Sequence, residues 1–158
     1  MSANPAKLAE QIGNEGVAWS ALLDTLSREE NALVTGQADA LPPLAAVKLD
    51  QLNAVSALAR SRLDALRHAG CTPDAPGMAS WLAQHGTPTV RANWQSLCKL
   101  EDEARACNLR IGKLIDMRLS ATRQSLNVLM QAAVGRNGLY DPSGQSVSSR
   151  ISQPLTAA

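Results

Sequence analysis

The chain has 158 residues, of which 45% are hydrophobic and only 3% aromatic, and its formal net charge is +1. This length suits one domain with a modest core. A core with so few aromatic residues must be aliphatic, which favours packed helices over a β-sandwich. The near-neutral charge argues against a nucleic-acid partner, because such a partner requires a basic face.

Membrane insertion and secretion are also disfavoured. No run of residues is long and apolar enough to span a bilayer, and the opening stretch MSANPAKLAEQIGNEG lacks the apolar segment of a secretory signal. Cys71, Cys98 and Cys107 are odd in number and lack the spacing of a metal site. We interpret them as free thiols in a reducing compartment, so the expectation is a soluble, cytoplasmic protein.

Apolar residues recur at steps of three and four, which predicts two long helices over about 5–35 and 40–69. Between them, Gly36 suits the left-handed position that follows a helix, and Asp39 is a candidate cap for the next one. Pro42 and Pro43 fit only in the first turn of the second helix.

Two further helices are predicted over 77–85 and 88–135, after the breaker-rich stretch CTPDAPG. Trp81 is expected to pack the short helix onto the others. The fold class is therefore all-α: an elongated antiparallel helical bundle or coiled coil of three long helices plus one short helix. We expect one bundle domain over residues 1–137 and a flexible, partner-binding tail over 138–158, where Ser, Gly and Pro are frequent.

The short link at 35–39 makes the first two helices an antiparallel hairpin, in which facing residues have numbers that sum to about 77. Glu29 then faces Lys48, and Glu15 faces Arg62. We predict two ion pairs at the exposed edge of the apolar seam, which set the register more than they add stability. The alternative is four unrelated solvated charges. The same apolar pattern predicts a set of buried residues: Leu22, Leu26, Leu52, Val55, Leu97, Ile111 and Ile115.

Residues for catalysis or metal binding are scarce. His68 and His85 both lie at predicted helix ends, where histidine commonly interacts with the helix C-terminus. A structural zinc site needs four ligands, and the sequence lacks both a C-x-x-C pair and the common nucleotide-binding motifs, so we expect no metal, no cofactor and no enzyme. Gly112, in the middle of a helix, marks either a close helix approach or ligand groove, or a tolerated surface glycine.

The stretch LYDPSGQ contains Tyr140, the only tyrosine of the chain. Asp141, Pro142 and Gly144 have the chemistry of a type I turn. An apolar stripe at steps of four follows this turn, formed by Val147, Ile151 and Leu155. The stripe is too weak to fold alone but can fold against a partner. Tyr140 is therefore either an interface anchor or a staple that holds the tail on the bundle.

Several ordered motifs together resemble the FlgN-like flagellar type III export chaperones over residues 15–145. The helical positions that match are Leu22-Leu23, Glu29, Ala32-Leu33, Leu44, Lys48, Leu52, Arg62 and Gly70. The stretch from Asn108 to Ile115 resembles the family pattern N-x-x-N-G-x-x-I, with Ile111 in place of the second Asn. Leu126-Asn127-x-Leu129 and the 139–144 stretch resemble the closing L-Y-G-x-x-G signature, with Asp141 in place of Gly.

This resemblance implies a cytoplasmic, helical protein without enzymatic activity. Such chaperones bind the C-terminal helical segments of the hook–filament junction proteins FlgK and FlgL, keep them soluble and deliver them to the export gate. For this chain, the resemblance implies that the substrate contacts the end of the long helix and the tail. It also implies that Tyr140 docks at the export gate. The candidate partner-binding residues are Asn108, Gly112, Ile115, Leu126, Leu129, Leu139, Tyr140, Val147, Ile151 and Leu155.

The alternatives are a helical scaffold or coiled-coil adaptor with no export role, and a small helical enzyme that uses His and Cys residues. A homo-oligomer is left open by the sequence.

Overall fold

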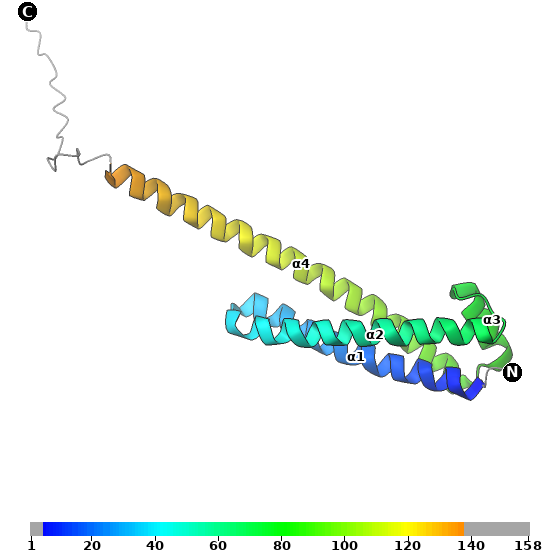
Figure 1. Cartoon of the computed structure of the whole chain (residues 1–158). Coiled ribbons are helices and arrows are strands. Elements are labelled where there is room, and N and C mark those ends of the chain that lie inside the picture. The colour runs from blue at the N-terminus through cyan, green and yellow to red at the C-terminus, as the bar shows by residue number, and fades with distance from the viewer. Residues whose placement is uncertain (1–4, 138–158) are drawn as a thin grey trace, which may run out of the picture. The chain divides into compact units, whose positions relative to one another are not determined.

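The computed structural model describes residues 5–137, and all its regular elements over this range are helices. They are α1 (Pro5–Thr35), the 3-10 turn η1 (Ala38–Ala40), α2 (Leu41–His68), α3 (Ala75–His85) and α4 (Pro88–Asn137) (Figure 1). The all-α fold and the four helices predicted from the sequence are confirmed. The chain divides into two compact units, residues 1–115 and 116–158, which are described separately below.

The chain reverses between α1 and α2 as predicted, but with different local chemistry. Gly36 has a φ of 75°, the left-handed conformation that glycine adopts without steric cost, and the Gln37 N–H donates to the Ala32 carbonyl at 2.9 Å. The prediction that Asp39 caps α2 is wrong. Asp39 lies inside η1, and α2 begins after Ala40 with no side-chain cap. The η1 turn replaces the cap by continuing the chain directly into α2.

Helix α3 begins two residues earlier than the sequence predicted, because Asp74 caps it. The Gly77 N–H donates to Asp74 Oδ1 at 2.8 Å, and the Thr72 hydroxyl donates to the same oxygen at 2.6 Å. These two hydrogen bonds, that of Thr72 first, lower the pKa of the Asp74 carboxyl. A side chain at Gly77 would come within 1.8 Å of the Thr72 carbonyl oxygen, so the close approach requires glycine.

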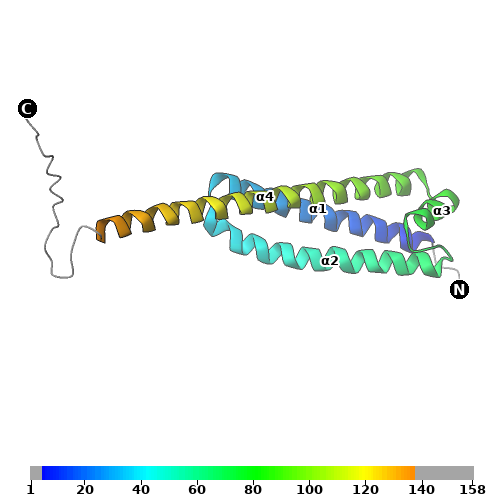
Figure 2. The ribbon, with the colours of Figure 1, turned by 90° about the horizontal axis from the view of Figure 1, so that it is seen from above.

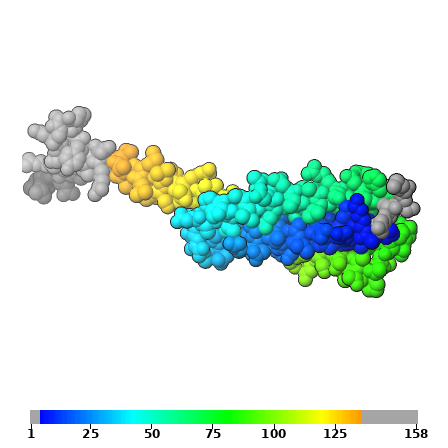
Figure 3. Space-filling view, turned by 60° about the horizontal axis from the view of Figure 1, so that its bottom comes forward, coloured from blue at the N-terminus to red at the C-terminus, as the bar shows by residue number. Residues whose placement is uncertain are grey.

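Within residues 1–115, α1, α2 and the first part of α4 run up, down and up. Helices α1 and α2 lie antiparallel and side by side (Figures 1 and 2). This first part of α4 runs parallel to α1 (Figure 1), and on one face of the unit α1 lies between α2 and the start of α4 (Figure 3). Two buried clusters hold this unit together. One contains Leu8, Ile12, Leu66, Met78, Trp81, Leu82 and Leu97, and the other Leu22, Leu26, Leu33, Val55, Ala104, Cys107 and Ile111.

Most of the predicted core is buried. This holds for Trp81, which packs α3 onto the bundle as expected, and for Leu22, Leu26, Val55, Leu97 and Ile111. The prediction is wrong for Leu52 and Ile115, which are 41% and 39% exposed. The buried residues of α2 are only Leu44, Val55 and Leu66, since a three-helix bundle covers a narrow strip of each helix. Leu52 lies at the margin of that strip.

Both predicted ion pairs are present. Arg62 Nε lies 2.7 Å from Glu15 Oε2, and Lys48 Nζ lies 2.7 Å from Glu29 Oε2. Their predicted exposure is wrong, however, because Glu15 and Glu29 are buried and the Glu15 side chain is only 1% exposed. Arg62 also places its guanidinium carbon 5.0 Å from the ring centroid of Trp94 on α4. The Glu15–Arg62 pair therefore joins all three long helices at one level.

Replacing Arg62 with Met should lower the free energy of unfolding by about 3–5 kcal/mol, because it leaves the buried Glu15 carboxylate without its partner. Urea denaturation followed by circular dichroism measures this loss. Arg67→Met is the control: it breaks a pair with Asp64 in which both side chains are more than half exposed, and it should cost less than about 1 kcal/mol. Equal losses in the two variants would contradict a buried role for Arg62.

The corrected core gives a second prediction. Leu97→Ala should cost about 2–5 kcal/mol, because a fully buried side chain leaves a cavity. Leu52→Ala should cost clearly less, since its side chain keeps much of its contact with water. The same urea titrations compare the two variants, and a Leu52→Ala loss as large as that of Leu97→Ala would show that Leu52 belongs to the core.

Candidate partner-binding surface

The predicted partner-binding residues that the structure describes all lie on α4. At about 100° per residue, the three in the first unit fall within about 60° of arc, and the two in the second unit lie about 60° apart. All of them are exposed, and they are Asn108, Gly112, Ile115, Leu126 and Leu129. The other predicted residues lie outside the described range, so their roles stay predictions: Leu139, Tyr140, Val147, Ile151 and Leu155.

In the first unit, Asn108, Gly112 and Ile115 are exposed and lie on one flank of the buried Ile111. A Cβ built on Gly112 would meet no atom within 4 Å. Among the described residues there is thus no close helix approach at Gly112. Its surroundings are an open surface, which a partner can contact without rearrangement of the bundle.

The part of α4 that lies in the second unit exposes an apolar surface, here called the distal stripe. Residues 116–135 are all exposed. At about 100° per residue, four large apolar residues lie within about 100° of arc and form this stripe: Leu119, Leu126, Leu129 and Met130. Val134 lies at its margin, whereas Met117 and Val128 lie on the opposite side of the helix. A helix gains most of its stability by burying an apolar face, but residues 116–135 of α4 bury no side chain against the part of the chain that the structure describes. Contiguous exposed apolar surface marks interaction sites.

Two ion pairs from neighbouring residues of α1 connect this helix to α2 and to α4. Glu29 points to Lys48 on α2, whereas Glu30 accepts hydrogen bonds from Arg110 on α4 at 2.6 and 3.0 Å. The hydrogen bond from Arg110 lowers the pKa of the Glu30 carboxyl. The Cys107 thiol also donates to Glu30, at 3.4 Å, and burial raises the pKa of that thiol. This contact fixes the turn of α4 that carries Asn108.

The histidines and cysteines do not form a reactive group. Nδ1 of His68 lies 2.6 Å from the Asp64 carbonyl oxygen at the end of α2, and His85 stacks on Trp81 with ring centroids 5.6 Å apart. Over residues 5–137, no group of three or more His, Cys, Asp or Glu side chains is arranged to hold a metal ion. The same range contains no helix long and apolar enough to cross a membrane.

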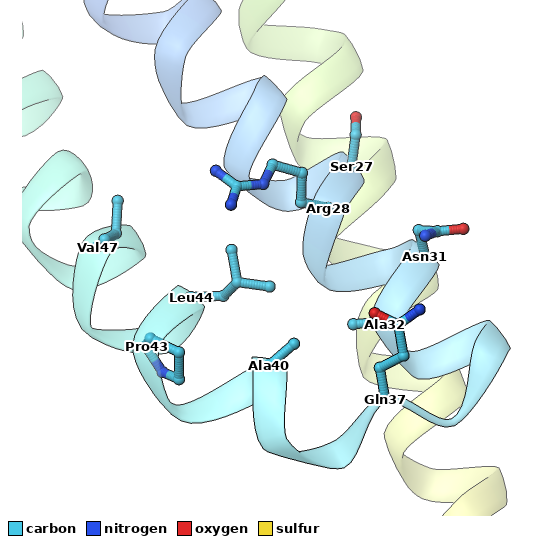
Figure 4. Close-up of a pocket in the computed structure, with 9 residues that line it drawn as sticks. All are labelled: Ser27, Arg28, Asn31, Ala32, Gln37, Ala40, Pro43, Leu44 and Val47. Carbon is cyan, nitrogen blue, oxygen red and sulfur yellow. The ribbon is translucent and has the colours of Figure 1, made fainter.

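A hollow of ≈ 460 Å³ at the α1–α2 reversal was not anticipated from the sequence (Figure 4). Its floor is apolar and its rim polar, and the lining residues are Ser27, Arg28, Asn31, Ala32, Gln37, Ala40, Pro43, Leu44 and Val47. The space lies where the two helices diverge from the reversal, and the small side chains of Ala32 and Ala40 leave it unfilled. These alanines beside the predicted link were the available signal, but they do not show by themselves that the helices diverge there.

An all-α bundle that exposes apolar residues along one helix, as residues 116–135 do here, is typical of helical binding proteins. The model of the protein family described as FlgN protein matches residues 1–148. The chain therefore belongs to the FlgN family, a family of flagellar export chaperones rather than of enzymes. No curated protein and no solved structure matches the chain.

Proposed function

We propose that this protein is a cytoplasmic chaperone for the C-terminal helical segments of FlgK and FlgL, which it keeps soluble and delivers to the type III export gate. The observation that carries the proposal is the distal stripe: residues 116–135 contain large apolar side chains, and none of them is buried. An amphipathic helix of an exported subunit has an apolar face of its own. Packing the two faces together removes both from water.

The tail extends this surface in the proposal. Val147, Ile151 and Leu155 repeat at steps of four, so they supply a second apolar strip for the same partner. Tyr140, between α4 and this strip, is proposed to contact the export gate. A tyrosine suits such an interface because it offers a large amphipathic surface with few rotatable bonds.

A second candidate function rests on the same stripe. Exposed apolar residues along a helix also suit self-association, as in a coiled-coil scaffold or adaptor without an export role. Sedimentation of the chain with and without an exported segment separates the two functions. A chaperone binds the segment in a defined ratio, whereas a scaffold remains self-associated in its presence.

Ending the chain at Asn137 should leave the bundle folded and weaken binding to the FlgK or FlgL C-terminal peptide, because the tail strip is lost. Replacing Leu126 and Leu129 with Ser should also weaken binding, with little effect on unfolding because both side chains are exposed. Calorimetric titration measures the affinities. Ser120→Ala is the control, since it alters an exposed side chain of the same helix without removing apolar surface. If both binding variants bind like the full chain, the surface at Asn108, Gly112 and Ile115 becomes the better site.

Tyr140→Ala should separate the two proposed roles. Substrate binding should be retained and export of the bound subunit lost, as measured by secretion of FlgK and FlgL from cells that carry the variant. Tyr140→Phe keeps the ring and tests the hydroxyl alone. If Tyr140→Ala instead unfolds the bundle, the tyrosine is a structural staple.

A further inference from the structure

The hollow at the α1–α2 reversal combines an apolar floor with one charged side chain. Leu44, Ala40 and Ala32 face its centre, and Arg28 extends from α1 across it toward α2 (Figure 4). Arg28 is the only charged residue among those that line the hollow, and no acidic residue lines it. The lining therefore carries one positive charge over aliphatic carbon.

Arg28 is free to bind a ligand. Two acidic residues next to Arg28 in the sequence are engaged elsewhere, since Glu29 pairs with Lys48 and Glu30 pairs with Arg110. The exposed Asp24 on α1 and Asp39 in η1 do not line the hollow. Among the described residues, Arg28 has no ion pair or side-chain hydrogen bond. A guanidinium presents its N–H groups in a planar fork that matches a carboxylate. Gln37 also lines the hollow and adds a polar, uncharged amide to its rim.

We infer that the hollow binds the free C-terminal carboxylate and the last apolar side chain of an exported subunit. The carboxylate accepts hydrogen bonds from Arg28, and the side chain packs on Leu44, Pro43 and Val47. The volume of ≈ 460 Å³ is within the range of about 300–1,000 Å³ that is typical of small-ligand sites. This inference rests on the proposed function, because it deepens it: the chaperone recognises the end of the chain as well as an apolar helix face.

The test compares two synthetic peptides with the last 25 or so residues of FlgK, one with a free C-terminal carboxyl and one amidated, by calorimetric titration of the full chain. The free acid should bind about ten-fold more tightly, as for a hydrogen bond to a charged group. Arg28→Gln should weaken binding of the acid peptide by the same factor and abolish the difference between the peptides. Arg28→Lys, which keeps the charge but not the fork, should recover part of the loss.

Arg60→Gln is the matched control. It removes the same charge from an exposed position on α2, outside the hollow, and should leave both affinities unchanged. An equal loss in Arg60→Gln would show a general effect of net charge and would overturn the inference. Equal binding of acid and amide peptides to the unmodified chain would also overturn it, while the measured affinity would still support the proposed function. Failure of both peptides to bind would overturn both.

Discussion

The buried ion pair between Glu15 and Arg62 is the constraint on which the first unit depends. Taking two charges out of water is costly unless they meet with good geometry, and Glu15 is almost completely buried. The hairpin can therefore close in only one register, since a slip of one residue would leave a buried carboxylate unpaired. Arg62 also lies over Trp94, so the register of the hairpin sets the position of α4 as well. Aliphatic packing alone, which tolerates sliding, does not supply this specificity.

Acidic residues of α1 form ion pairs with both neighbouring helices, α2 and α4. Glu29 and Glu30 are adjacent on α1 and point about 100° apart. One pairs with Lys48 on α2 and the other with Arg110 on α4. Together with Glu15, they give α1 ion pairs at two levels of the bundle. The two apolar core clusters and these polar contacts all lie within residues 1–115.

Much of this arrangement was predictable from the sequence, because the hairpin obeys simple arithmetic. A short link forces the first two helices to pair antiparallel. The two pairs of opposite charge, Glu15 with Arg62 and Glu29 with Lys48, then both fit the same register. The errors concern properties that depend on all three helices at once. Leu52 and Ile115 follow the apolar period, but whether a residue at the edge of a stripe is buried depends on how far the neighbouring helix extends around it. The Asp74 cap was readable from local sequence, whereas the Arg28 hollow depends on the divergence of two helices.

An exposed apolar stripe is tolerable in this protein because the folding energy comes from elsewhere. The buried clusters and buried ion pairs lie within residues 1–115, so the exposed distal residues of α4 are not needed for the core. A surface that is already helical loses little conformational freedom when a partner binds, whereas the partner segment must become ordered. Affinity then depends mainly on the apolar area that the two faces bury together. A fixed polar contact such as Arg28 would add what aliphatic packing lacks, a preference for one end of the partner chain.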